Sequence, residues 1–156
     1  MAYEFAARHP ELIAGVVALA PPVTRSALKV PANQPVHILH IHGTSDSLVP
    51  YGGDSAKTIP FPIGPQSFDF IGALASVEIW AGFNNCTDFG SDVETTLDLV
   101  EEIAEIDSTV SRYEACPPGG TVELWTIQGG DHFFVEPTTE FREKVIEWLL
   151  QHPKPQ

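Results

Sequence analysis

The distribution of apolar residues along the chain predicts three buried strands. The run Gly15–Ala20 is apolar on both faces, and further strands are predicted at Val36–His42 and Thr121–Ile127. A strand that is apolar on both faces is buried on both, as in a parallel sheet covered by helices. Glycine or proline follows each run and limits its length.

Helical spacing of apolar residues appears in three other segments. Met1–Arg8 ends before a proline, and Thr139–Gln151 has an apolar face formed by Phe141, Val145, Trp148 and Leu149. Ser76–Phe83 is predicted to be a short amphipathic helix, with Ser76 as its N-cap.

The remaining segments predict connections and two short extended pieces. Pro31–Pro35 is predicted to be a linker and residues 58–68 a loop, because both are rich in proline or glycine. Leu97–Leu99 and Val110–Tyr113 alternate like strands. The three main strands alternate with helices, which predicts an α/β fold with a mostly parallel sheet flanked by helices.

Composition narrows the class of protein. The chain has 156 residues, 43% of them hydrophobic, which suits one packed domain. A formal net charge of −13 argues against binding to nucleic acids and to anionic membrane surfaces, both of which need lysine and arginine clusters. Eight acids lie between Asp88 and Asp107 without a lysine or arginine among them, and this stretch is interpreted as a solvated face.

The sequence leaves the state of its two cysteines open. Cys86 and Cys116 are the whole thiol complement, and they suit either buried free thiols or one disulfide. Two cysteines alone do not decide the compartment.

Two polar residues follow predicted strands at positions suited to chemistry. Asp46 comes four residues after His42, and His132 comes five residues after Ile127. Functional groups of open α/β sheets lie just past the carboxyl ends of strands, where a carboxylate orients an imidazole. The alternative is that Asp46 is a turn residue and His132 is structural.

Other candidate chemistry is weaker. His40 and His42 form an H-x-H pair, but no third ligand at suitable spacing completes a zinc site. A nucleophile elbow of the form G-x-S-x-G is absent from the sequence. Ser45 and Ser47 flank Asp46 in its own loop and do not replace such an elbow.

Four ordered motifs resemble one family. These are Met1–Leu12 with the apolar strand that follows, His40–Gly53, Ser76–Trp80 with Asn85-Cys86, and Arg112–Cys116 followed by Val122–His132. Together they resemble the C-terminal half of α/β-hydrolase-fold esterases of the polyhydroxybutyrate depolymerase and feruloyl esterase-like branch. The resemblance covers nearly the whole chain. It departs from the family pattern around the histidine, where Asp131 stands in place of glycine and Phe133-Phe134 stand in place of Thr-Trp.

The resemblance implies a partial α/β-hydrolase fold over residues 1–156 and a serine esterase acting on small ester or polyester substrates. By this carry-over Asp46 is the triad acid, His132 is the general base and the serine lies upstream of the chain. Cys86 and Cys116 match a family disulfide, which implies an extracellular or periplasmic parent, although no signal peptide pattern is present. The resemblance implies no metal or organic cofactor.

The resemblance also predicts an incomplete sheet. In the family, the strand at Gly15–Ala20 pairs with the strand that leads to the elbow, so here its edge is expected to be exposed. A second copy of the chain, or the missing N-terminal half, is expected to cover this edge. The alternative function is a catalytically inactive half-domain that acts as a binding or assembly module.

Overall fold

A mixed five-stranded sheet forms the centre of the molecule, in a computed structural model that describes residues 2–24, 34–104, 106–133 and 136–155. The strand order is β1-β2-β7-β6-β5. These strands are β1 (Gly15–Leu19), β2 (His37–Gly43), β5 (Thr87–Leu97), β6 (Ser108–Ala115) and β7 (Val122–Ile127).

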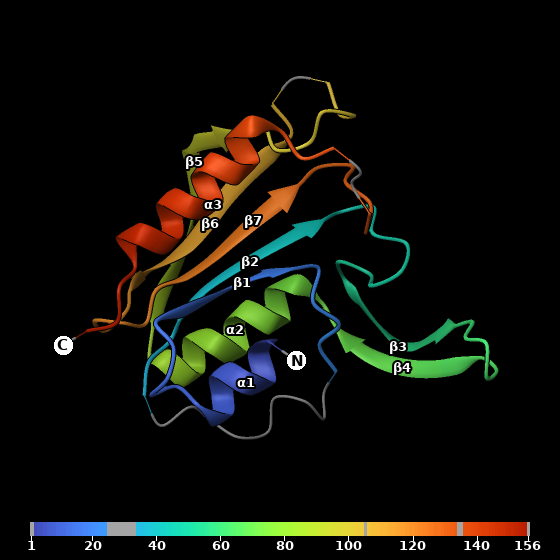
Figure 1. Ribbon diagram of the computed structural model, residues 1–156, viewed down its shortest axis with the longest axis horizontal. Helices are drawn as coiled ribbons and strands as arrows, with labels where there is room; N and C mark the ends of the chain where they lie inside the picture. Colours follow the sequence, from blue (N-terminus) through green and yellow to red (C-terminus); the bar gives the residue numbers. More distant parts are fainter. Residues whose placement is uncertain (1, 25–33, 105, 134–135, 156) are drawn as a thin grey trace.

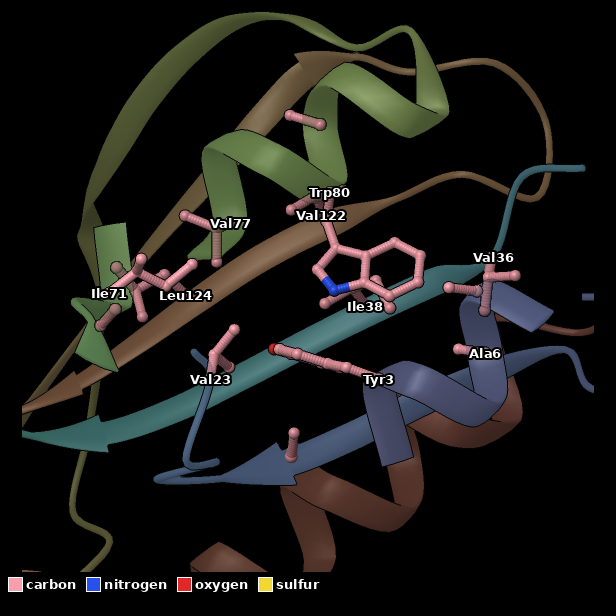
Figure 2. Packing of buried hydrophobic residues seen from close by; sticks show 14 residues of the cluster. Tyr3, Ala6, Val23, Val36, Ile38, Ile71, Val77, Trp80, Val122 and Leu124 are labelled. Carbon is pink, nitrogen blue, oxygen red and sulfur yellow. The ribbon is translucent and has the colours of Figure 1, made fainter. Parts of the chain in front are cut away.

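Helices cover both faces of the sheet (Figure 1). Helices α1 (Ala2–Arg8) and α2 (Ala73–Asn84) pack on one face, where Tyr3 and Trp80 lie side by side over β2 (Figure 2). Helix α3 (Thr139–Gln151) covers the other face through Phe141 and Trp148. Because both faces are covered, every residue of β2 and β7 is buried, including the polar ones.

The three strands predicted from apolar runs are present and adjacent. β1 pairs with β2 and β2 with β7, both in parallel. The prediction of a mostly parallel sheet is confirmed only in part, because β6 and β5 extend the two parallel pairs with two antiparallel pairs. From the sequence, this region was predicted to form only short extended pieces. The reason is that β6 buries side chains mainly near its start, so only that part shows the alternation of a strand.

A hairpin that the sequence did not predict lies between β2 and α2. β3 (Gly53–Ile59) pairs antiparallel with β4 (Gln66–Ile71), so the loop predicted at residues 58–68 is wrong at both ends. The hairpin projects from the sheet near the carboxyl ends of β2 and β7 (Figure 1). Most of its side chains are exposed or half-buried, which removes the apolar alternation that would reveal strands.

Helix α2 begins three residues earlier than predicted. Its N-cap is Gly72, and Ser76 lies inside the first turns, where its hydroxyl donates to the Gly72 carbonyl oxygen at 2.9 Å. The predicted N-cap at Ser76 is therefore wrong. A serine within a helix can satisfy its hydroxyl by bonding to the carbonyl four residues back, and Ser76 does so while buried.

The acidic stretch is only partly the solvated face that we expected. Asp88 and Asp98 are exposed, but Asp107 is buried. Its carboxylate accepts hydrogen bonds from the backbone N–H groups of Leu99 and Val100 and from the Ser108 hydroxyl. A buried carboxylate needs such donors, so Asp107 orders the turn between β5 and β6.

Cys86 and Cys116 form a disulfide, with an S–S distance of 2.10 Å. The bond joins the end of α2 to the end of β6 across 30 residues of sequence. It confirms the pairing that the family resemblance implied.

Two other expectations concern the limits of the sheet. β1 pairs with β2 alone among the described strands, so it is an edge strand as predicted. Residues 31–33 of the predicted linker Pro31–Pro35, and Met1 of the first helix, lie outside the described residues. In the described part of the chain, no helix is long and apolar enough to cross a membrane.

Candidate active site

Asp46 and His132 meet at the carboxyl edge of the sheet. β2 and β7 are parallel neighbours, so the loops that follow them leave from the same edge. The Asp46 Oδ2 atom lies 2.8 Å from His132 Nδ1, a hydrogen-bond distance. The structure thus brings together the two residues that the sequence singled out; their catalytic roles stay predictions.

A glycine makes this approach of the two loops possible. A Cβ atom on Gly43, at the end of β2, would lie 2.1 Å from the Gly130 carbonyl oxygen. No side chain fits in that space. The same carbonyl oxygen accepts the Ser45 N–H at 3.0 Å, which ties the loop of Asp46 to the loop of His132.

The Asp46 carboxylate is buried and accepts three hydrogen bonds. Its side chain is 0% exposed, whereas the His132 side chain is 18% exposed. The Oδ1 atom accepts the backbone N–H groups of Leu48 and Val49 at 2.9 and 2.7 Å. Oδ2 accepts His132 Nδ1, and His42 Nε2 lies 3.2 Å from the same oxygen. Three hydrogen bonds, with the His42 ring nitrogen close by, fix the orientation of the carboxylate.

Asp131 is a second tie between the loops, and sequence reasoning assigned it no role. Its Oδ1 atom accepts the backbone N–H and the hydroxyl of Ser47, both at 2.9 Å. The N–H of His132 donates to the same oxygen at 2.7 Å. These bonds, led by that from the Ser47 backbone, lower the pKa of the Asp131 carboxyl. The presence of Asp131 where the resembled family has glycine was the feature of the sequence that could have indicated this role.

His40 and His42 are buried and hydrogen-bonded to each other, with Nε2 of the first 3.0 Å from Nδ1 of the second. Burial lowers the pKa of both imidazoles, and that of His40 falls to about 3. Among the residues described, no group of three or more histidine, cysteine or acidic side chains is arranged to hold a metal ion. The H-x-H pair is part of the packed interior beneath the site.

These buried histidines predict loss of stability in mild acid. The folded pKa of His40 is about 3 against an ordinary value of 6.5, so the unfolded chain binds its proton at higher pH than the folded chain. The contribution of neutral His40 to the free energy of unfolding is therefore complete above pH 6.5 and declines as the pH falls towards 3. At pH 5 the expected loss from His40 is about 2 kcal/mol relative to pH 8.

Denaturant unfolding of wild type and His40→Gln at the two pH values measures this effect. The variant cannot titrate at that position and is expected to lose the part of the difference that His40 contributes, whereas exposed His9→Gln should keep the full difference. An equal pH dependence in wild type and His40→Gln would show that burial of His40 is not its cause.

An apolar cavity of about 510 Å³ opens beside His132. The hairpin contributes Phe61, Phe68 and Phe70, and the rings of the last two stack at 5.3 Å. Leu48 and Val49, from the loop of Asp46, line the same space. Its walls therefore favour an uncharged, apolar group next to the imidazole.

The arrangement suits general base chemistry. With Nδ1 bonded to Asp46, the nitrogen of His132 left to accept a proton is Nε2. A buried carboxylate on Nδ1 fixes that tautomer and stabilises the imidazolium formed when Nε2 takes the proton. The sequence contains no G-x-S-x-G motif, the pattern that carries the nucleophile of α/β hydrolases.

Comparison with known proteins finds distant similarity to two esterases. The chain is 30% identical over 99 residues, 64% of its length, to feruloyl esterase B of Piromyces equi. It is 28% identical over 150 residues, 94% of its length, to a protein named "Putative esterase NocK" from Nocardia uniformis subsp. tsuyamanensis. These matches span 16% and 42% of the relatives' own lengths. No family model matches the chain.

Proposed function

We propose that this chain supplies the acid and the base of a serine-type carboxylic ester hydrolase of the α/β-hydrolase fold. The observation that carries the proposal is the 2.8 Å bond between Asp46 Oδ2 and His132 Nδ1 at the carboxyl edge of parallel strands. Similarity to proteins named as esterases supports the same class of reaction.

In the proposed mechanism, the nucleophilic serine comes from a segment upstream of residue 1. His132 Nε2 removes the serine proton as the hydroxyl oxygen attacks the ester carbonyl carbon, and Asp46 stabilises the imidazolium. The imidazolium then gives its proton to the leaving alcohol, which leaves an acyl-enzyme. Water, deprotonated by His132, releases the acid and restores the serine.

The apolar cavity supports a proposal for the substrate. Its aromatic and aliphatic walls suit short-chain, aryl or hydroxycinnamoyl esters rather than charged ones. The disulfide between Cys86 and Cys116 supports an extracellular or periplasmic location, since disulfides persist in oxidising compartments. We further propose that the free edge of β1 is the place where the nucleophile-bearing half pairs with the sheet.

The proposal is tested by the DNA immediately upstream of the codon for Met1. We expect an in-frame G-x-S-x-G motif there, and turnover of p-nitrophenyl acetate and butyrate by the longer polypeptide. The chain of 156 residues alone is expected to show no efficient turnover. Efficient turnover by the short chain that His132→Ala abolishes would place the nucleophile within it and refute the upstream serine.

A further inference from the structure

Behind the Asp46 carboxylate, a line of three buried side chains runs back to the first helix. Tyr3 on α1, His40 and His42 on β2 are 4%, 1% and 2% exposed. The Tyr3 hydroxyl lies 2.9 Å from His40 Nδ1, and His40 Nε2 lies 3.0 Å from His42 Nδ1. His42 Nε2 lies 2.8 Å from the Val49 carbonyl oxygen and 3.2 Å from Asp46 Oδ2.

The direction of every hydrogen bond in this line follows from the last ring nitrogen, His42 Nε2. His42 Nε2 faces a carbonyl and a carboxylate, which only accept, so Nε2 carries the proton. In a neutral ring Nδ1 is then an acceptor, and it needs a proton from His40 Nε2. His40 Nδ1 is an acceptor by the same reasoning and takes the Tyr3 hydroxyl proton.

The environment keeps both rings in this neutral form. Burial lowers the pKa of His40 to about 3, and it lowers the pKa of His42 despite the neighbouring Asp46. The planes of the two imidazole rings are 13° from parallel, and their centroids are 5.3 Å apart. Tyr3 is held by an edge-on contact with Trp80, whose ring lies beside it in Figure 2.

We propose that Tyr3, His40 and His42 are positioning residues. Their one-way hydrogen bonds keep the His42 N–H on the Val49 carbonyl oxygen, beside Asp46 Oδ2, and so hold the acid loop and its carboxylate on His132. The inference rests on the proposed function, because it gives these residues a purpose only if the Asp46–His132 pair acts in catalysis. Each ring fixes the tautomer of the next. The Tyr3 hydroxyl therefore determines that His42 carries its proton on Nε2, the nitrogen that faces the loop of Asp46.

The test uses NMR of the chain itself and needs no nucleophile. In wild type, nitrogen shifts are expected to show both His40 and His42 as neutral Nε2–H tautomers. The Nδ1–H of His132 is expected as a resolved downfield proton signal. A wild type with His42 as the Nδ1–H tautomer, or charged at neutral pH, would overturn the proposal.

Variants separate positioning from folding. His42→Leu is expected to lose the His132 Nδ1–H signal through exchange with water, and His42→Gln, which keeps a donor near the Nε2 position, to retain it. His37→Leu is the matched control, because His37 lies on the same buried strand but donates nothing to Asp46, and it should retain the signal. A folded His42→Leu with an unchanged signal would refute the positioning role.

Tyr3→Phe covers the case in which His42→Leu does not fold. Without the hydroxyl, His40 Nδ1 loses its donor, and mixed tautomers of both histidines are expected. Unchanged tautomers of His40 and His42 would refute the claim that Tyr3 sets the direction of these hydrogen bonds. Absence of the His132 signal from wild type would instead count against the proposed function, while the tautomers of His40 and His42 would still be measurable.

Discussion

Asp46→Asn, in a protein that carries the nucleophile, is expected to lower kcat for ester hydrolysis about 10⁴-fold with little change in the fold. If the amide oxygen keeps the backbone N–H groups of Leu48 and Val49, the NH₂ group takes the place of Oδ2. It then faces His132 Nδ1 and His42 Nε2, so Nδ1 must become the acceptor. The proton moves to Nε2 of His132, which can no longer accept one from serine.

The steady-state rate with p-nitrophenyl butyrate measures this loss. Asp54→Asn makes the same chemical change at an exposed position of the hairpin and is expected to leave kcat unchanged. A kcat for Asp46→Asn within about tenfold of wild type would mean that Asp46 does not fix the tautomer of the base.

Asn84→Ala is expected to lower the free energy of unfolding by roughly 3–5 kcal/mol. Asn84 is 0% exposed and lies at the end of α2. Its Oδ1 accepts the Val36 N–H at 3.2 Å, and its Nδ2 donates to the carbonyl oxygens of Val36 and Gly120 at 2.8 and 2.9 Å. Alanine leaves three buried backbone groups without this partner, just before β2 and β7 begin.

Urea unfolding with the disulfide intact measures the change. Asn85→Gly is the matched control: Asn85 has a φ of 57°, which glycine adopts freely, so its replacement is expected to stay within about 0.5 kcal/mol of wild type. A loss below about 1 kcal/mol for Asn84→Ala would show that water replaces the amide at no great cost.

The part of the fold that the sequence predicted is the part buried on both faces. β1, β2 and β7 stand out because helices cover both sides of them, and α3 because one face packs on the sheet. The hairpin of β3 and β4 escaped prediction because its side chains are largely exposed. Pairing of β5 with β6 depends on contacts between distant residues, which no local pattern encodes.

The candidate site also has a part that the sequence predicted and a part that only the folded structure reveals. Asp46 and His132 were predicted because each follows a strand whose ending is visible in the sequence. The line from Tyr3 to His42 was not, because a tyrosine in a helix meets an H-x-H pair on a strand only after folding. Asp107, interpreted as a solvated acid, is buried by backbone donors that the composition of its neighbours did not reveal.

The central claim is that His132 and Asp46 serve a serine outside this chain. Labelling with a fluorophosphonate, followed by peptide mass spectrometry, tests it most directly. In the longer polypeptide we expect one modified serine, within an upstream G-x-S-x-G motif, and loss of labelling in His132→Ala. The chain of 156 residues alone should remain unlabelled. Labelling of Ser45 or Ser47, or labelling of the upstream serine that is unchanged by His132→Ala, would contradict the account.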